Sequence, residues 1–371
     1  MKPEATGPNR NMRQTERALR EGLSEGLQSG GQIYVSENGR PVFEEAFGEV
    51  RPSEAMTTGH LLPWMSSSKP VAAVAIAQLW ERGLLALDDR VADHIQEFGT
   101  RGKESITIRH LLTHTGGIRT LDVGWPKATW EEIIAKICRG RLEPRWVPGQ
   151  TAGYHLTSSW FILGEIVHRA DGRSFDQYVR HEVFEPLEMR DSWIGMPVET
   201  FTQNAERLAP LFDTQPGVPV ELSWSSEKRV TRCSPGANGW GPARELGRFY
   251  EMLLTGGTWQ GVQILLPQTV EALTARHRSG LFDKTFRQIL DWGLGFVING
   301  SNEDSRSGYG HWPSASARAF GHSGYQSSTA FADPERHVAI AILLNGTPDE
   351  NSHLRRMRAI TTAIYQDLGY A

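Results

Sequence analysis

The stretch SSSKPVAAVAIAQLW, residues 66–80, places three serines and a lysine ahead of an almost unbroken apolar run. That run is apolar on every face of a helix, which predicts a buried helix over residues 70–80. The serines offer oxygens for the N-cap, Pro70 suits the first turn, and Gly83 suits the C-terminal cap. A helix buried on all sides is therefore expected early in the chain.

Ser66 and Lys69 are spaced so that both lie on one face at the mouth of this helix. The free N–H groups of a helical first turn stabilise an oxyanion, and burial there favours the neutral, basic form of a lysine. The same spacing occurs at Ser225 and Lys228, but that stretch is polar without a helical period, so we expect an exposed loop. The pattern thus predicts Ser66 as a nucleophile and Lys69 as its base.

Outward from this helix, β-rich stretches lie near both ends of the chain. Asn38-Gly39 separates two β-rich runs, residues 32–37 and 41–47, which predicts a hairpin after a helix over residues 12–27. Further strands are predicted at residues 293–299, 317–332 and 337–345, a long exposed loop at 300–316, and helices at 108–114, 130–138, 159–169, 175–183, 243–254 and 354–368. This order favours one mixed sheet built from both ends of the chain, with a helical insert between them.

Length and composition narrow the class of protein. A chain of 371 residues predicts two structural units. The net charge of −4 leaves no basic surplus for binding nucleic acid, and no apolar run approaches the roughly 20 residues of a membrane span. Residues 1–20 lack the apolar core of a secretory signal, so a cytoplasmic protein is expected.

The cysteines and histidines of the sequence do not predict a disulfide framework or a metal site. The two cysteines, Cys138 and Cys233, exclude a disulfide framework and a cysteine-rich zinc site. His110 and His114 are four residues apart, but no carboxylate completes a metal set, so we interpret them as packing and capping residues.

Two further segments carry chemistry. Tyr154 follows the Pro148-Gly149 turn and precedes a helix, so it lies on a loop from which its hydroxyl can pass a proton in a cleft. In Gly-His-Ser-Gly-Tyr, residues 321–325, small residues let a substrate carbonyl approach, and the N–H of Tyr325 would face that of Ser66 as an oxyanion hole. Taken singly, the tyrosine is typical of a packing residue and the glycine-rich segment of a turn or bulge.

These three elements, in this order and at these separations, resemble the serine β-lactamase and penicillin-recognising fold, most closely class C β-lactamase-like serine hydrolases and family VIII carboxylesterases. The resemblance includes residues 106–118 (ITIRHLLTHTGGI), 184–189 (FEPLEM) and 292–296 (WGLGF), and it covers roughly residues 30–345. It implies an α/β (α+β) fold, in which an antiparallel sheet built from both chain ends is flanked by helices and carries an inserted, mainly helical domain. The expected boundaries are residues 12–90 together with 285–371 for the sheet domain, 91–284 for the helical domain, and 1–11 for a loose tail.

The resemblance also implies roles for individual residues. Ser66 would be acylated, Lys69 would be its base or proton partner, and Tyr154 would assist proton transfer as the first residue of the second motif. The backbone N–H groups of Ser66 and Tyr325 would form the oxyanion hole. The expected substrate-binding residues are His155, His322, Ser323 and Gly324.

Two positions depart from the lactamase pattern. The second motif of lactamases, Tyr-x-Asn, reads Tyr154-His155-Leu156 here, and leucine cannot bond the amide side chain of a β-lactam as asparagine does. The third motif lacks a lysine, and His322 is a weaker, pH-dependent partner for a carboxylate. Both changes favour a hydrolase of neutral esters.

We therefore expect a serine hydrolase that cleaves carboxylic esters through an acyl-enzyme on Ser66, without a metal or organic cofactor. Three alternatives stay open: a β-lactamase or D-amino-acid peptidase, an acyltransferase that uses the same acyl-enzyme, and a non-catalytic binding protein of this fold. The expected partner is a small-molecule ester or amide, with no nucleic acid and no membrane span, and the oligomeric state is open. Trp125, Trp240 and Trp312 are candidates either for lining the acyl pocket or for plain packing.

Overall fold

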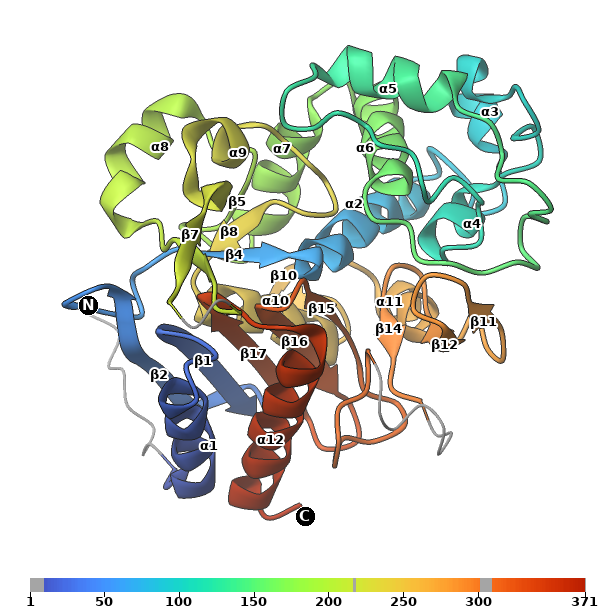
Figure 1. The fold of residues 1–371 in the computed structure, drawn as a ribbon. Helices are drawn as coiled ribbons and strands as arrows, with labels where there is room; N and C mark the ends of the chain where they lie inside the picture. The colour runs from blue at the N-terminus through green and yellow to red at the C-terminus, as the bar shows by residue number, and fades with distance from the viewer. Residues whose placement is uncertain (1–9, 216–217, 301–308, 371) are drawn as a thin grey trace.

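The structure is a computed structural model that describes residues 10–215, 218–300 and 309–370 (Figure 1). Most of the predicted tail at residues 1–11, and residues 301–308 of the predicted loop, lie outside the described residues.

An eight-stranded antiparallel sheet joins the two ends of the chain, in the order β13-β14-β15-β16-β17-β1-β2-β3. β1 pairs with β17 so that Ile33 lies opposite Ile342. The sheet built from both chain ends is confirmed, and the mixed sheet favoured by the pattern alone is antiparallel throughout. Its strands are β1 (Gly30–Glu37), β2 (Arg40–Arg51), β3 (Glu54–Ala55), β13 (Asp291–Trp292), β14 (Val297–Ile298), β15 (Phe320–Gly324), β16 (Ser328–Asp333) and β17 (Val338–Leu344).

The central strand β17 is buried along its whole length, and its alternating side chains serve two cores. Ile342 belongs to the same cluster as Ile364 of α12 (Glu350–Leu368). Its neighbour Leu343 belongs to the cluster that contains Phe249 of α10 (Ala243–Leu254). Helix α1 (Arg13–Ser24) lies beside α12 (Figure 1), so helices cover both faces of the sheet.

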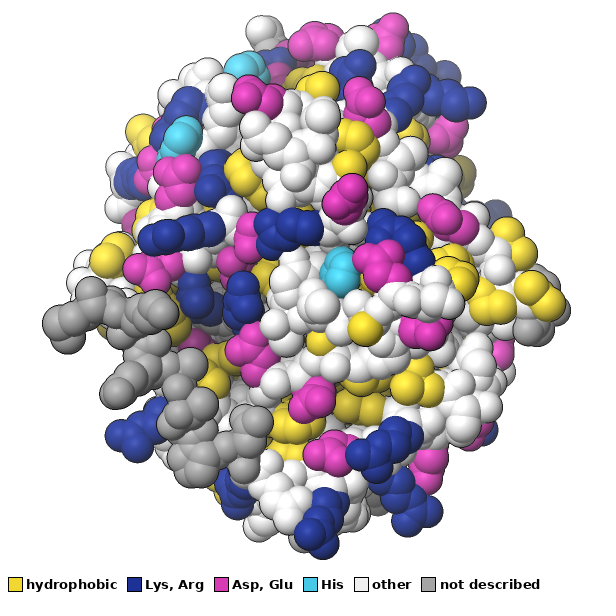
Figure 2. All heavy atoms as spheres, turned by 90° about the vertical axis from the view of Figure 1, so that its left-hand side faces the viewer, with side chains coloured by type: hydrophobic (Ala, Val, Ile, Leu, Met, Phe, Trp, Pro, Cys, Tyr) yellow, Lys and Arg dark blue, Asp and Glu magenta, His cyan; other side chains and the backbone are white. Residues whose placement is uncertain are grey.

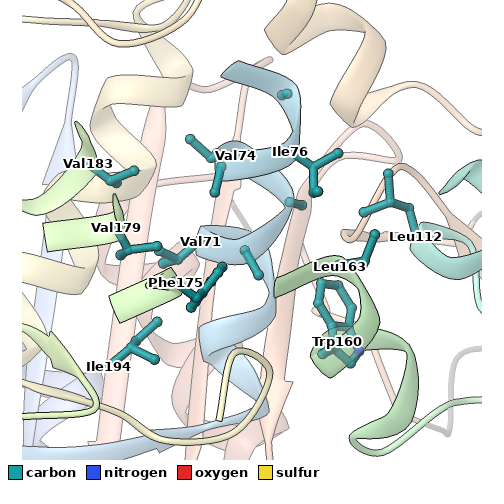
Figure 3. Packing of buried hydrophobic residues seen from close by; sticks show 14 of the residues in the cluster. Val71, Val74, Ile76, Leu112, Trp160, Leu163, Phe175, Val179, Val183 and Ile194 are labelled. Carbon is teal, nitrogen blue, oxygen red and sulfur yellow. The ribbon is translucent and has the colours of Figure 1, made fainter. Parts of the chain in front are cut away.

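Helix α2 (Lys69–Glu81) is buried at every position from Lys69 to Leu79, as its apolar run predicts. Figure 3 shows Val71, Val74 and Ile76 of α2 among side chains of α6 (Ser158–Asp171) and α7 (Phe175–Val179). Ser68 is the N-cap residue of α2, as predicted, but its side chain does not make the expected capping hydrogen bond. The three serines instead form a 3-10 turn, Ser66–Ser68, that leads into the helix.

The rest of the insert is mainly helical. The remaining helices are α3 (Val91–His94), α4 (Ile108–Leu112), α5 (Trp130–Arg139), α8 (Val198–Asn204), α9 (Glu227–Thr231) and α11 (Pro267–Thr274). The helix predicted at residues 175–183 ends at Val179 and continues as a π turn. The prediction of a loop around Ser225 and Lys228 is also wrong, because this stretch forms a 3-10 turn and helix α9. Lys228 is exposed, as expected.

The sequence pattern misses several short strands, because strands of two to four residues are too short to show an alternation. Two three-stranded sheets have the orders β4-β8-β5 and β18-β6-β7. Their strands are β4 (Leu62–Met65), β8 (Gly239–Gly241), β5 (Trp193–Ile194), β18 (Gly346–Thr347), β6 (Leu211–Asp213) and β7 (Val220–Leu222), and two small hairpins pair β9 (Thr258–Trp259) with β10 (Val262–Gln263) and β11 (Phe282–Asp283) with β12 (Gln288–Ile289). Strand β4 matters most here, since it ends directly before Ser66.

The surface is mixed in charge on the face seen in Figure 2, where Lys and Arg side chains alternate with Asp and Glu. Within residues 10–215, 218–300 and 309–370, no helix has the length and apolar content to cross a membrane.

Candidate active site

The three serines of the 3-10 turn have different partners. Ser67 Oγ donates to the main-chain oxygen of His322 at 3.1 Å, and Ser68 Oγ donates to Met65 O at 2.6 Å. Met65 holds a φ of 52°, a strained conformation for a residue with a side chain, directly before Ser66. The turn is therefore fixed by its second and third serines, and the hydroxyl of Ser66 is turned toward Lys69.

Lys69 is fully buried beside the predicted nucleophile, with 0% of its surface exposed. Its Nζ lies 2.9 Å from Ser66 Oγ, 3.0 Å from Leu156 O and 2.8 Å from Gly236 O. Burial lowers the pKa of this amine well below its ordinary value, which favours the neutral form. In the neutral form, two N–H groups of the amine can donate to the two carbonyl oxygens, and its lone pair can then accept the hydroxyl proton of Ser66.

Tyr154 lies beside this pair, with its ring centroid 5.0 Å from Lys69 Nζ. Its hydroxyl is buried and has no hydrogen-bond partner among the described residues. Burial raises the pKa of this phenol, while the neighbouring hydroxyls of Ser66 and Tyr309 pull it in the opposite direction. Tyr154 thus holds its proton at rest, next to the serine that it is predicted to serve.

The backbone of Tyr154 is held by the β11–β12 hairpin. Asp283 Oδ1 accepts the N–H of Tyr154 at 3.1 Å, and Thr285 Oγ1 donates to the carbonyl oxygen of Tyr154 at 3.1 Å. Asp283 Oδ2 accepts from Arg278 Nη2 at 2.8 Å, and the exposed fractions of these two side chains are 0% and 1%. A buried ion pair therefore fixes the segment that carries the tyrosine.

The third motif lies on β15, against the turn of Ser66. His322 is fully buried, and its Nδ1 lies 2.7 Å from Ser323 O and 3.1 Å from the Tyr309 hydroxyl. Because a carbonyl oxygen only accepts, Nδ1 carries the proton. Burial lowers the pKa of His322 well below its ordinary value. The position that is a lysine in lactamases is therefore a neutral imidazole here.

Gly324 brings the end of β15 against the residues before Ser66. A Cβ at position 324 would stand 2.5 Å from Trp64 O and 2.8 Å from the Cβ of Met65. Only glycine permits this approach of β15 to the residues directly before Ser66. The oxyanion hole formed by the N–H groups of Ser66 and Tyr325 stays a prediction that this approach makes sterically reasonable.

His155 occupies a different place from the other predicted substrate-binding residues. Its side chain has no exposed surface, its Nε2 accepts the N–H of Ile118 at 3.0 Å, and its own N–H donates to His114 Nδ1 at 2.9 Å. These bonds suit a residue that supports Tyr154 rather than one that contacts substrate. The side chain of Leu156, by contrast, is 61% exposed, although its carbonyl binds Lys69.

The three tryptophans proposed for the acyl pocket separate into two groups. Trp240 and Trp312 are buried core residues, and Trp312 stacks on Phe331. Trp125 lines a cavity of about 270 Å³ with Trp130 and other residues of the helical insert. The lining of that cavity contains neither Ser66 nor Tyr154, so it is separate from the predicted catalytic residues.

Three functional residues were not predicted from the sequence: Asp283 and Tyr309, which contact predicted site residues, and Arg278, which binds Asp283. No local sequence pattern identifies these residues as functional. Tyr309, for example, follows a Ser- and Gly-rich stretch that is typical of an exposed loop. In the part of the chain that the structure describes, no three His, Cys, Asp or Glu side chains gather where they could hold a metal ion.

Comparison with known proteins identifies the family and the fold. Over residues 14–363 the chain matches the protein-family model described as Beta-lactamase. It is similar to Esterase/beta-lactamase LipL of Mycobacterium tuberculosis, with 26% identity over 355 residues that cover 85% of this chain and 77% of the relative. A penicillin-binding protein homologue from Caulobacter crescentus has a TM-score of 0.77 and 28% identity, over 97% of this chain and 99% of that chain. A family VIII carboxylesterase has a TM-score of 0.79 at 24% identity, covering 97% of this chain and 100% of that one, which shows a shared fold.

Proposed function

Because the chain belongs to the Beta-lactamase family of serine hydrolases, we propose that it cleaves neutral carboxylic esters through an acyl-enzyme on Ser66. The observation that carries this proposal is the 2.9 Å contact between Ser66 Oγ and the fully buried Lys69 Nζ. A serine is a weak nucleophile at its own pKa, and a neutral amine at hydrogen-bond distance activates it.

The first half of the reaction acylates the enzyme. Ser66 Oγ bonds to the carbonyl carbon of the ester as its proton passes to Lys69 Nζ. The negative charge on the former carbonyl oxygen is stabilised by the N–H groups of Ser66 and Tyr325. The ester C–O bond then breaks, and the leaving oxygen takes the hydroxyl proton of Tyr154, which is replaced by the proton held on Lys69.

The second half returns the enzyme to its starting state. A water molecule gives one proton to Tyr154, whose own hydroxyl proton passes to Lys69 Nζ, as the water oxygen bonds to the acyl carbon. The bond between that carbon and Ser66 Oγ breaks, Ser66 recovers a proton from Lys69, and a carboxylic acid is released. No step requires a metal or an organic cofactor.

The preference for neutral esters rests on charge. The carboxylate of a β-lactam or of a D-amino-acid peptide is bound most strongly by a fixed cation. The third motif does not supply one, because His322 is a neutral, buried imidazole. An amide side chain gains from a polar partner, and the exposed Leu156 offers an apolar one. A neutral ester has neither a carboxylate nor an amide side chain, so neither change weakens its binding.

A substrate comparison tests the proposal. We expect a short-chain nitrophenyl ester to be hydrolysed with a higher kcat/KM than the cephalosporin nitrocefin. Rapid turnover of nitrocefin with no cleavage of the ester would contradict the proposal and favour the lactamase alternative. Product analysis with added alcohol separates hydrolysis from transfer, because an acyltransferase would yield a new ester in place of the acid.

A further inference from the structure

The hydroxyl of Tyr154 is a buried polar group without a hydrogen bond in the described structure. A buried hydroxyl is normally paired, and the exceptions call for a functional reason. Two hydroxyls are close enough to change its pKa, those of Ser66 and Tyr309. Ser66 is the predicted nucleophile, whereas Tyr309 has no role in the reaction as described so far.

Tyr309 is held in place by its ring and by its hydroxyl. Its ring stacks on Phe286 with centroids 4.1 Å apart and an interplanar angle of 14°. Its hydroxyl donates to Ser323 O at 2.8 Å and lies 3.1 Å from His322 Nδ1. The rings of Tyr309 and Tyr154 are 6.2 Å apart. A second phenol is thus fixed between the third motif and the predicted acid.

We infer that Tyr309 is a positioning residue for the leaving-group step, because its hydroxyl donates to the oxygen of Tyr154 when that oxygen becomes charged. This inference rests on the proposed function. In that step the O–H bond of Tyr154 breaks, the proton goes to the leaving oxygen of the ester, and the charge remains on the tyrosine. Tyr309 keeps its own proton and turns it from Ser323 O toward the charged oxygen, until Lys69 supplies the missing proton.

The charges around the two phenols fit these roles. Burial raises the pKa of Tyr309 well above its ordinary value, and Tyr154 and Glu350 raise it further, so Tyr309 stays a donor. Burial raises the pKa of Tyr154, as does the field of Asp283, whereas the hydroxyls of Ser66 and Tyr309 lower it. Burial lowers the pKa of His322, so its imidazole brings no positive charge to this site. While Tyr154 is charged, Lys69 holds the proton taken from Ser66, and a hydrogen bond from Tyr309 adds a second stabilisation at the oxygen of Tyr154.

Two esters of one acyl group separate this role from a structural one. The leaving group of an ethyl ester is ethoxide, a strong base that needs the proton of Tyr154 in order to leave. The leaving group of a p-nitrophenyl ester is p-nitrophenolate, a stable anion that leaves without a proton. The substitution Tyr309→Phe keeps the ring on Phe286 and removes only the hydroxyl. We expect kcat/KM for the ethyl ester to fall roughly tenfold, as for the loss of one hydrogen bond to a charge, and that for the p-nitrophenyl ester to fall by less than about threefold.

Two further variants calibrate the result. Tyr154→Phe should show the same selectivity with a larger loss on the ethyl ester, on the order of 100-fold. Tyr370→Phe also deletes a phenol hydroxyl, one that bonds Glu37 near the C-terminus, and should leave both rates unchanged. Equal losses on the two esters in Tyr309→Phe, or no loss on either, would overturn the inference while leaving the proposed function intact. A wild-type protein inactive on both esters would instead refute the proposed function, and the inference with it.

Discussion

Ser67 and His322, which lie 255 positions apart in the chain, are joined by a hydrogen bond of 3.1 Å from the serine hydroxyl to the histidine carbonyl. The same hydroxyl lies 3.0 Å from Ser328 Oγ, which in turn donates to Trp64 O at 2.7 Å. This short network joins the turn of Ser66 to strands β15 and β16. It places the predicted nucleophile and the third motif in one rigid unit.

Ser67→Ala should weaken this unit. The substitution leaves a buried carbonyl without its donor, so we expect the free energy of unfolding to fall by about 1–3 kcal/mol, measured by urea denaturation. Ser24→Ala, which removes an exposed hydroxyl, is the matched control and should change stability by less than about 0.5 kcal/mol. An unchanged unfolding midpoint in Ser67→Ala would show that the bond contributes nothing.

Gly324→Ala should abolish most activity. The new Cβ would stand 2.5 Å from Trp64 O, so the end of β15 must move away from Ser66 and take the N–H of Tyr325 with it. Loss of one oxyanion donor predicts a decrease in kcat on the order of 100-fold or more. Gly59→Ala adds the same methyl group where its nearest neighbour is 3.7 Å away, and it should remain active. Full activity in Gly324→Ala would remove Tyr325 from the account.

Asp283→Asn should destabilise the segment that carries Tyr154. It leaves the guanidinium of Arg278 buried and unpaired, which costs about 3–5 kcal/mol in the free energy of unfolding. Asp88→Asn breaks an exposed ion pair with Arg109 and should cost less than about 1 kcal/mol. Equal effects of the two substitutions, measured by denaturant titration, would contradict the anchoring role of Asp283.

The pH dependence should report the neutral Lys69. Burial lowers the pKa of this amine well below 10.5, and only the unprotonated form accepts the proton of Ser66. The value of kcat/KM should therefore rise as the pH increases through the lowered pKa and reach its plateau well before pH 10.5. A rise centred at the ordinary lysine value of 10.5 would show that Lys69 is not the base in the form described.

Local patterns predicted a good part of this molecule. The apolar run at residues 71–79 identified a buried helix, and the spacing of Ser66 and Lys69 predicted the 2.9 Å contact between them. The hairpin around Asn38-Gly39 is present as β1 and β2. The domain boundaries stay a prediction.

The features that could not be predicted from the sequence depend on contacts between residues far apart in the chain. Asp283 binds the backbone of Tyr154 across 129 positions, and no local period announces such a bond. The serines before α2 look like caps, but their hydroxyls bind other strands. His155 looks like a substrate contact because it follows Tyr154, yet its ring is buried against Ile118. In each case tertiary packing decides how a polar side chain is used.

We expect Ser66, and not Ser225 of the second Ser-x-x-Lys sequence, to form the covalent intermediate. The most direct measurement is the intact mass of the protein after treatment with a fluorophosphonate, followed by peptide mapping. We predict one adduct on Ser66 in the wild-type protein and in Ser225→Ala, and none in Ser66→Ala. An unlabelled but folded wild-type protein, or an adduct that persists in Ser66→Ala, would contradict the account.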